Sequence, residues 1–272
     1  MKKCRADIAL KEQLNLENIE LARALIMEGR VMVGDRKIFQ SGELIKGDAV
    51  FRVKGELAAY VSRGAHKLRR ALEIFRIDLA GKTCIDVGAS TGGFTEVMLR
   101  AGAKRVYAVD VGYNLLDYRL RSDERVVCME RTNARFLTQD LFETRLDFGA
   151  TDVSFISLKT VLPAALSVIR PGGRFVALVK PQFEAPREDV GDKGVVRNPE
   201  VHARVLDEII RFLPEVGWKA VGLDYSPIRG PEGNIEFLLD MVEGDNPMKS
   251  NLKVSIEATI DSAYEKFFKS SS

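Results

Sequence analysis

The sequence contains few of the residues that build disulfide frameworks or zinc sites. Only three cysteines and two histidines occur among its 272 residues. The cysteines (Cys4, Cys84 and Cys128) are odd in number and widely spaced, which argues against both a disulfide framework and a Cys/His zinc site. We therefore expect no metal site.

Long apolar runs are also missing. The longest stretches, such as Gly173–Val179, are far shorter than the ~20 residues that a membrane-spanning helix needs. The N-terminus is basic, but residues 6–12 never become the apolar core of a signal peptide. We therefore expect a cytoplasmic protein with no stable membrane partner.

The chain has little net charge, with 41 basic and 39 acidic side chains, but this charge is unevenly distributed. Residues 1–58 carry eleven Lys and Arg against nine acids, residues 59–82 carry six against two, and the remaining 190 residues have a net charge of −4. Concentrated basic charge is expected where a polyanion docks. A solvated helix face explains the same counts, so charge alone leaves both interpretations open.

The length predicts two unequal domains, because a single core usually stops growing past ~250 residues. Helical spacing followed by short strands predicts a small α+β module over residues 1–58, with two helices ending at Gly29 and with Asn15 or Asn18 capping the second. Residues 55–60 are predicted to be a linker region, and the boundary between the domains is set at residues 59–62. A larger domain over 63–244 and a polar tail over 245–272, with one amphipathic helix at Ile256–Phe268, complete the predicted organisation.

After Gly81 the pattern alternates between strands and helices, which predicts a mostly parallel sheet covered on both faces. The predicted strands are 83–87, 105–109, 125–129, 148–153, 174–180, 218–225 and 236–242. The predicted helices include 93–101, 199–212 and an earlier one that runs through Phe75 and is capped by Ser62. Seven strands with a late pair suit an α/β, doubly wound fold of the Rossmann-like methyltransferase type with an antiparallel edge.

A glycine-rich turn follows the first predicted strand, where it leads into a helix. Small residues there let a ligand approach the backbone, and the start of the helix supplies unpaired N–H donors. Asp110 closes the second strand 22 residues past Gly88, where an acid can accept hydrogen bonds from ribose hydroxyls. These features fit a nicotinamide dinucleotide as well as S-adenosylmethionine.

Two details favour S-adenosylmethionine as the cofactor. Asp86 lies two residues before the first glycine, where a carboxylate suits the amino group of the methionine part and would repel a pyrophosphate. The turn has Gly88 and then the adjacent pair Gly92-Gly93, unlike the spaced dinucleotide fingerprint. Asn133 is a candidate beside the adenine, although an Asx turn explains it equally well. The predicted cofactor residues are Asp86, Gly88, Ala89, Ser90, Gly92, Gly93, Phe94, Asp110, Val111 and Asn133.

Charged residues at strand ends in such a sheet face the ligand crevice. Asp152, Lys180 and Glu236 stand at predicted strand ends, and Lys67 lies on the basic helix ahead of them. Each alone could be an ordinary salt-bridge residue. Together they form the set that an RNA ribose methyltransferase needs, because a ribose 2′-hydroxyl is a poor nucleophile and a lysine with a lowered pKa can remove its proton.

Six ordered motifs carry a close resemblance to a known family. They are Ser62–Leu68, Asp86–Phe94, Glu130–Arg135, Asp152–Leu158, Val179–Glu184 and Gly233–Phe237. The chain resembles the TlyA family of ribosomal RNA 2′-O-methyltransferases, which share the FtsJ-like catalytic domain. The resemblance implies methylation of ribose, at cytidine, in ribosomal RNA or ribosomal subunits. It also implies a catalytic set of Lys67, Asp152, Lys180 and Glu236, with Lys180 as the central base.

The N-terminal segment resembles the small RNA-binding module named after the fourth small-subunit ribosomal protein. Its matching positions are Arg5, Asp7, Leu10, Ala22, Ile26, Gly29 and Val31, whereas Asn18-Ile19 and Ser41-Gly42 depart from the usual pattern. Basic side chains of this module and of the following helix are candidate phosphate contacts, which position RNA without reading its sequence. The predicted RNA-binding residues are Arg5, Arg23, Arg30, Arg36, Arg63, Arg69 and Arg70.

Two other function classes make different predictions. Members of the family have also been labelled haemolysins, but a pore-former needs a spanning helix or strands able to close a barrel. The apolar strands predicted here instead suit a core buried on both faces. A non-catalytic RNA-binding protein would have lost part of the catalytic set, and all four positions are intact.

Overall fold

The computed structural model describes residues 3–14, 16, 19–27, 29–47, 49–54, 60–244 and 251–269. The chain divides into two compact units, residues 1–59 and 60–272. The predicted helix caps Asn15 and Asn18, and tail residues 245–250, lie outside the described residues.

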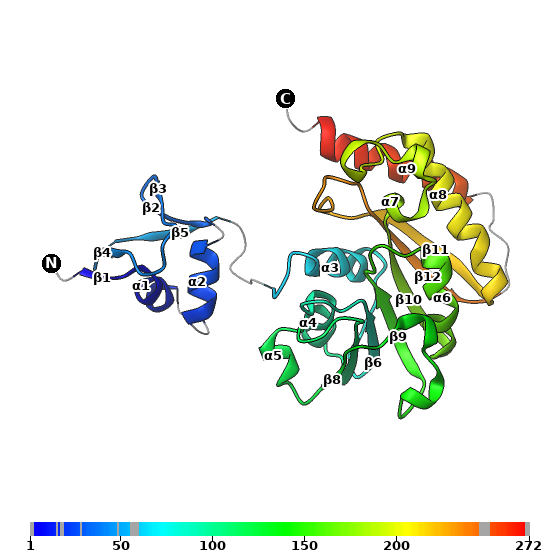
Figure 1. Ribbon diagram of the computed structural model, residues 1–272, viewed down its shortest axis with the longest axis horizontal. Helices are drawn as coiled ribbons and strands as arrows, with labels where there is room; N and C mark the ends of the chain where they lie inside the picture. The colour runs from blue at the N-terminus through cyan, green and yellow to red at the C-terminus, as the bar shows by residue number, and fades with distance from the viewer. Residues whose placement is uncertain are drawn as a thin grey trace. The chain divides into compact units, whose positions relative to one another are not determined.

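The first unit is a small α+β body with its own apolar core (Figure 1). Leu10 of the first helix and Leu25 and Ile26 of the second are fully buried in a cluster with strand residues such as Val31. Strand β1 pairs with β4, and β2 pairs with both β3 and β5, all antiparallel. The elements are β1 (Lys3–Arg5), α1 (Ala6–Gln13), α2 (Ile19–Met27), β2 (Val31–Val33), β3 (Arg36–Lys37), β4 (Leu44–Lys46) and β5 (Phe51–Val53).

The second unit is built on a seven-stranded sheet with the order β11-β12-β10-β9-β6-β7-β8. Only β12 runs antiparallel to its neighbours; all other adjacent pairs are parallel. The predicted α/β class with a seven-stranded, mostly parallel sheet is confirmed. The strands are β6 (Thr83–Val87), β7 (Arg105–Val109), β8 (Val126–Met129), β9 (Leu146–Thr151), β10 (Ile169–Val179), β11 (Trp218–Tyr225) and β12 (Phe237–Glu243).

The predicted antiparallel edge is wrong in one respect. The antiparallel strand β12 lies between β10 and β11, and the edge strand is β11. A loop of eleven residues, 226–236, returns the chain from β11, so that β12 fills the place beside β10. The first residues of β12 therefore lie beside the last residues of β10, where Phe237 pairs with Val179.

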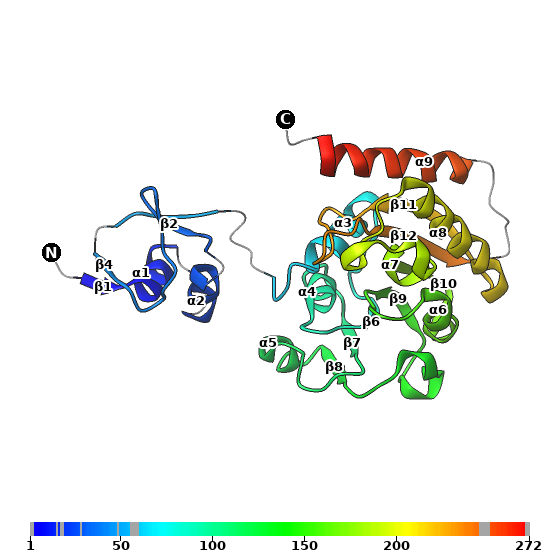
Figure 2. The same cartoon turned by 45° about the horizontal axis from the view of Figure 1, so that its top comes forward.

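Helices cover both faces of this sheet (Figures 1 and 2). Because side chains alternate along a strand, Ile85 and Val87 of β6 join one apolar cluster and Cys84 joins the other. The first cluster includes residues of α6, α8 and α9, and the second includes residues of α3 and α4. The helices are α3 (Ala65–Ile74), α4 (Gly93–Arg100), α5 (Tyr118–Arg121), α6 (Leu158–Ser167), α7 (Pro181–Glu184), α8 (Pro199–Phe212) and α9 (Asn251–Tyr264).

Several element ends differ from the sequence-based expectation. Strand β9 ends at Thr151 and β10 begins at Ile169, with a register shift before Arg174. The residue before α3 is Gly64, which makes no side-chain cap, so the predicted cap by Ser62 is wrong. Ser62 Oγ instead accepts a hydrogen bond from the Gly64 amide at 3.1 Å. Helix α9 begins at Asn251 and continues into a π-helical turn, Glu265–Lys269.

Candidate active site

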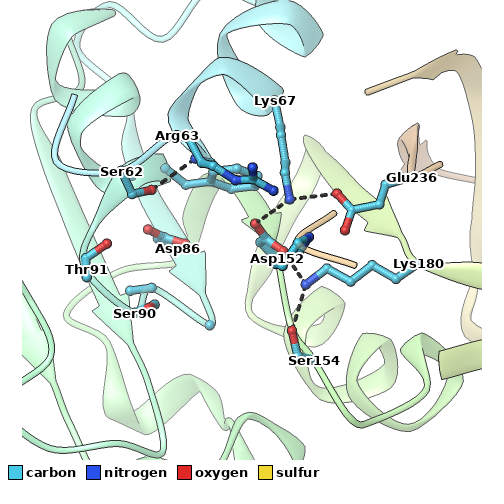
Figure 3. A pocket seen from close by; sticks show the side chains of 16 residues that line it. Ser62, Arg63, Lys67, Asp86, Ser90, Thr91, Asp152, Ser154, Lys180 and Glu236 are labelled. Atoms are coloured by element: carbon cyan, nitrogen blue, oxygen red, sulfur yellow. Dashed lines mark hydrogen bonds and ion pairs between the residues drawn. The ribbon is translucent and has the colours of Figure 1, made fainter. Parts of the chain in front are cut away.

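The predicted catalytic residues meet at one edge of the large sheet (Figure 3). Asp152 directly follows β9, Lys180 directly follows β10, and Glu236 directly precedes the antiparallel β12. Lys67 reaches the same place from the first turn of α3. The carboxyl ends of parallel strands, and the start of an antiparallel one, lie at a common edge, which is the usual ligand crevice of such sheets.

Two lysines and two carboxylates form one connected cluster. Lys67 Nζ lies 2.7 Å from Glu236 Oε2 and 3.5 Å from Asp152 Oδ2. Lys180 Nζ lies 2.6 Å from Asp152 Oδ1 and 2.8 Å from the hydroxyl oxygen of Ser154. Figure 3 shows Asp152 between the two ammonium groups. The structure therefore brings all four predicted residues together and adds Ser154.

Three of the four side chains of this cluster are buried, Asp152 is 19% exposed, and the formal charges balance. The exposed fractions of the side chains are 1% for Glu236, 7% for Lys67 and 9% for Lys180. Burial raises the pKa of Glu236, and the nearby Lys67 cation opposes that rise. Losing one partner would leave a buried charge uncompensated, which costs several kcal/mol (~3–5). Buried, coupled ionisable groups in a cleft mark a candidate functional site.

A cavity of about 280 Å³ joins this cluster to the glycine-rich turn. Its lining includes all four clustered residues together with Asp86, Gly88 and Gly93. A second cavity of about 400 Å³ is lined by Asp110, Val111 and Asn133. The two cavities share Gly88, Ser90, Asp152 and Ser154 in their walls, so the cluster and all the predicted cofactor residues except Gly92 line adjoining spaces.

Asp86 is completely buried, and one of its oxygens has no partner. Its Oδ2 accepts hydrogen bonds from the Thr95 amide at 2.8 Å and the Thr95 hydroxyl at 2.7 Å. Its Oδ1 has no hydrogen-bond partner among the described residues. Burial raises the pKa of Asp86 to about 7. An unsatisfied buried oxygen that lines a cavity suits an ammonium group, as in the amino acid part of S-adenosylmethionine.

Two positions of the glycine turn have left-handed backbone and no space for a Cβ. Gly88 has a φ of +84°, and a Cβ there would lie 3.2 Å from the carbonyl oxygen of Asp152. A Cβ at Gly92, with a φ of +98°, would lie 2.2 Å from a methyl group of Leu120. Both positions therefore require glycine. Gly93 then begins α4 and lines the first cavity together with Phe94.

The second cavity has acceptors suited to a nucleoside. The Asp110 carboxylate is fixed by the amides of Ser90 at 2.8 Å and Gly112 at 2.7 Å. It keeps acceptor capacity for ribose hydroxyls, because each carboxylate oxygen can take more than one hydrogen bond. Asn133 Oδ1 accepts the Arg135 amide at 3.1 Å, so the Asx-type turn is present, and the residue also lines the cavity. These residues fit an adenosine group.

Two aromatic residues at the site were missed by sequence reasoning. Phe155 is 90% exposed and has a φ of +63°, an uncommon backbone conformation for a bulky residue. Its ring centroid lies 4.9 Å from that of Phe183, whose ring is 5.9 Å from Lys180 Nζ. Strained, exposed residues often mark functional sites. Both lie inside the motifs Asp152–Leu158 and Val179–Glu184, but nothing in the sequence singles out their rings.

The predicted phosphate contacts of the first unit make local hydrogen bonds or ion pairs. Arg5 and Arg23 both bond the buried carboxylate of Asp7, whose pKa is lowered to about 2, chiefly by the Arg5 hydrogen bond. Arg36 pairs with Glu43 at 2.6 Å, and Arg30 Nε donates to the Lys54 carbonyl oxygen at 2.9 Å. These contacts fix the directions of the guanidinium groups.

The basic side chains around α3 have different surroundings. Arg63 lines the first cavity and donates to the Arg229 carbonyl oxygen at 2.8 Å. Arg69 lies 3.8 Å from Glu73. Arg70 forms an ion pair with Asp224 at 2.6 Å and packs over the ring of Tyr225 at 4.9 Å from its centroid. The surroundings of Arg70 therefore favour an internal link over the predicted phosphate contact.

The large sheet is Rossmann-like, and its first strand, β6, is followed by the glycine turn and carries Asp86 with its unsatisfied oxygen. These features are those of a methyltransferase. Residues 60–241 match the FtsJ-like methyltransferase family, and the chain belongs to that family. This confirms the predicted enzyme class and, with it, the predicted cofactor, S-adenosylmethionine.

The relatives extend this finding to most of the chain. A Bacillus subtilis protein, YqxC, whose name describes it as a candidate rRNA methyltransferase, is 49% identical over 241 residues, covering 88% of this chain and 86% of its own length. The 16S/23S rRNA (cytidine-2′-O)-methyltransferase TlyA of Mycobacterium tuberculosis is 44% identical over 239 residues, covering 88% and 89%. A solved structure, titled as a candidate hemolysin from Streptococcus thermophilus, is 43% identical, with a TM-score of 0.78 and coverage of 99% and 98%.

The alternatives are not favoured by these observations. No helix within the described ranges is long and apolar enough to cross a membrane. The four catalytic candidates are present and joined by ion pairs, unlike in an RNA-binding protein that had lost catalysis.

Proposed function

We propose that this chain methylates the ribose 2′-hydroxyl of a cytidine in ribosomal RNA, using S-adenosylmethionine. The observation that carries the proposal is the buried cluster of Lys67, Asp152, Lys180 and Glu236 beside the glycine cradle. A 2′-hydroxyl needs a base at the moment of attack, and this cluster supplies amines in a water-poor setting. The relatives' names for rRNA and cytidine agree with this chemistry.

The surroundings of the two lysines favour Lys180 as the base. Lys67 Nζ lies between two carboxylates, Glu236 and Asp152, which both stabilise its positive charge. Lys180 has one carboxylate partner and a neutral hydroxyl, Ser154. Lys180 therefore has fewer carboxylate partners than Lys67, and we assign it the role of the base. The neutral amine accepts the hydroxyl proton, while Asp152 holds both lysines in place.

Cofactor binding is assigned to three groups of the chain. Asp86 Oδ1 would accept a hydrogen bond from the amino group of the methionine part, and Asp110 would accept hydrogen bonds from the ribose hydroxyls. The glycine turn would let the cofactor lie close to the backbone. When bound, S-adenosylmethionine supplies an electrophilic methyl group.

The exposed Phe155 and the partly buried Phe183 beside it are assigned to the target nucleotide. Single-stranded or flipped bases are held by stacking on aromatic rings, and this contact is worth ~1–3 kcal/mol per base. The pair lies beside Lys180, so a base stacked there would bring its ribose toward the amine.

The first unit is assigned to RNA binding, with ribosomal RNA or ribosomal subunits as partners and the cytoplasm as the location. Its support is the resemblance to a small RNA-binding module and the orientation of Arg5, Arg23 and Arg36 by acidic partners. Fixed guanidinium groups suit phosphate oxygens, which position an RNA without reading its bases.

Methyl transfer to ribosomal subunits tests the proposal. Tritiated S-adenosylmethionine is incubated with purified subunits or naked ribosomal RNA and either the wild type or Lys180→Ala. We expect incorporation with the wild type and a loss of at least 100-fold with Lys180→Ala, since general-base catalysis contributes about 10²–10⁴-fold. Mass spectrometry of nucleosides then identifies 2′-O-methylcytidine.

Lys159→Ala is the matched control. Lys159 is an exposed lysine on α6 whose only assigned role is an ion pair with Glu208 at 3.2 Å, so its loss should leave transfer unchanged. No transfer by a wild type that binds the cofactor, on either subunit or naked RNA, would sink the proposal.

A further inference from the structure

The C-terminal segment 251–269 lies beyond residues 60–241, the part that matches the family. It consists of α9 and the π-helical turn Glu265–Lys269. Helix α9 packs alongside α8 (Figure 2), and its buried residues Ile256, Ile260 and Ala263 join the apolar cluster of that face. Burial of this face explains why the helix forms, but it assigns no role to the turn that follows.

The turn holds the side chain of Arg229, which belongs to the loop between β11 and β12. The Arg229 guanidinium donates a hydrogen bond to the Phe267 carbonyl oxygen. Its Cζ also lies 5.0 Å from the ring centroid of Phe267 and 4.6 Å from that of Phe268. A cation held by two rings and a carbonyl oxygen is fixed from several directions.

The Arg229 loop ends at a catalytic candidate. The next residue, Gly230, approaches the Glu236 carboxylate so closely that a Cβ there would lie 2.8 Å from Oε1. Pro231 lines the first cavity. The carbonyl oxygen of Arg229 also accepts the bond from Arg63, four residues before Lys67. The loop therefore connects the C-terminal turn with both members of the Lys67–Glu236 pair.

A second route leads from the same turn to the helix that carries Lys67. The Phe267 ring packs edge-on against Tyr225, with centroids 6.2 Å apart. Tyr225 is covered by the Arg70 guanidinium, and Arg70 also bonds Asp224 at 2.6 Å. Arg70 lies one helical turn beyond Lys67 on α3. Phe267 thus contacts both structures that carry the ion pair. It contacts the Arg229 loop, which ends at Glu236, and through Tyr225 and Arg70 it contacts α3, which carries Lys67.

We propose that the C-terminal turn, through Phe267 and Phe268, positions the Arg229 loop and α3 so that Lys67 and Glu236 keep their ion pair. Phe267, Phe268 and Arg229 are positioning residues; they do not touch the reacting atoms. The proposal rests on the methyl-transfer function proposed above.

The geometry explains why a small movement matters. Lys67 and Glu236 are nearly inaccessible to water and lie 2.7 Å apart, so a shift of the loop weakens a buried pair directly. Displacement of catalytic groups by ~1 Å can reduce turnover about 10²-fold. Asn234 provides another anchor for the loop, because its side chain bonds the Val196 amide at 2.9 Å and the Gly194 carbonyl oxygen at 2.8 Å. We therefore expect a partial loss of activity.

The experiment compares the full-length wild type with Phe267→Ala/Phe268→Ala. We expect kcat for methyl transfer to fall about tenfold, while the Kd for S-adenosylmethionine changes less than twofold, because the cofactor residues lie on other loops. Hydrogen exchange of the Gly230 and Gly233 amides, which are bonded within the loop, should become at least fivefold faster.

Two further variants separate positioning from overall stability. Ile260→Ala removes a buried side chain of α9, 4% exposed, that makes none of the Arg229 contacts described above. It should lower the melting temperature and leave kcat unchanged at 25 °C. Phe267→Tyr/Phe268→Tyr keeps both rings and should keep kcat. If the double alanine variant does not fold, Phe268→Ala replaces it, since Phe268 is 52% exposed and leaves no core cavity.

The outcomes decide the proposal separately from the proposed function. A folded alanine variant with unchanged kcat and unchanged exchange overturns the positioning role. A parallel loss of cofactor affinity, or an equal loss of kcat in Ile260→Ala, also overturns it, because both indicate a general effect of stability. If the wild type transfers no methyl group, the proposed function fails, and the exchange rates alone decide whether the turn holds the loop.

Discussion

At the scale of single residues, Asp86 couples cofactor binding to pH. Its carboxyl group is buried, one oxygen is bonded by Thr95 and the other has no partner among the described residues. Burial raises its pKa to about 7. An approaching ammonium group favours the ionised form, so binding of S-adenosylmethionine should release a proton when the pH is near or below 7.

We predict that the Kd for S-adenosylmethionine rises as the pH falls through 7, by up to about tenfold per unit, because only the ionised Asp86 attracts the ammonium group. Titration calorimetry between pH 6 and 8.5, in buffers of different ionisation enthalpy, measures both the Kd and the released proton.

Asp86→Asn provides the comparison that isolates the protein group. The amino group of the ligand also titrates, but its contribution is common to both proteins. The variant should bind more weakly, with a shallower pH dependence. Equal slopes for the two proteins would show that Asp86 does not titrate on binding.

The raised pKa of Asp86 has a further consequence for the free energy of unfolding. Without cofactor, stability falls as the pH rises from ~4 to about 7, because the folded carboxyl retains a proton that the unfolded chain has released.

At the scale of elements, one side chain joins the two loops that carry the catalytic groups. Glu184, the last residue of α7, accepts the Ser157 hydroxyl at 2.6 Å and the Leu158 amide at 2.7 Å. It therefore caps the start of α6, and burial raises its pKa. The loop after β9 carries Asp152 and Phe155, whereas Lys180 and α7, which includes Phe183, directly follow β10. Glu184 therefore fixes the segment after β10 against the loop after β9.

Glu184→Ala should lower the free energy of unfolding by about 2 kcal/mol, because two hydrogen bonds to a charged, largely buried group are lost. It should also reduce kcat, since Lys180 and Asp152 lose their fixed separation. Urea denaturation and methyl-transfer rates measure the two effects.

Glu208→Ala is the control for a surface carboxylate. Glu208 pairs with Lys159 at 3.2 Å and is half exposed, so its loss should cost less than ~1 kcal/mol. Glu184→Gln, which retains an acceptor oxygen, should be less affected than the alanine variant. Equal stability of Glu184→Ala and Glu208→Ala would contradict the capping role.

The sequence predicted most of the large sheet because long apolar strands separated by helices give a clear pattern. It missed β1 and β4, which are three residues each and too short to show alternation. It placed the start of β10 at Arg174, because the preceding Pro171-Gly172-Gly173 resembles a loop. The place of β12 inside the sheet depends on contacts between distant segments, which periodicity does not encode.

The candidate site was predictable where charge stands at a strand end. Lys180 after an apolar strand demands a partner, and the structure supplies Asp152 at 2.6 Å. Ser154 and Phe155 gave no such signal, because a serine or a phenylalanine near a strand end is common. The contacts of Arg229 with Phe267 and Phe268 join residues almost forty positions apart, and only the folded chain brings them together.

At the scale of the whole molecule, the near-neutral net charge combines a basic front part with an acidic remainder. Residues 1–82 hold seventeen basic and eleven acidic side chains. Every phosphate neutralised by a cation releases counterions, so the logarithm of RNA affinity should fall linearly with the logarithm of salt concentration. The slope counts contacts without needing the structure of a complex.

We predict that Arg36→Ala reduces the magnitude of this slope by about one unit, because each lost phosphate contact removes about that much. Arg36 suits the test because its side chain is 61% exposed while it pairs with Glu43. Filter binding of ribosomal RNA at salt concentrations from about 50 to about 300 mM measures this slope for each variant.

Arg170→Ala is the matched control. It also removes one positive charge, but from the end of the large sheet opposite the catalytic cluster. Arg170 is 44% exposed and pairs with Asp147 at 2.6 Å, near the start of β10, whereas the catalytic cluster lies at the strand's end. The two variants therefore have equal net charge and differ only in where the charge was lost. A smaller slope with Arg36→Ala alone indicates a local contact of the first unit with RNA. Equal changes in both variants would instead mean that the RNA responds to overall charge, and the first unit would lose its assigned role in positioning it.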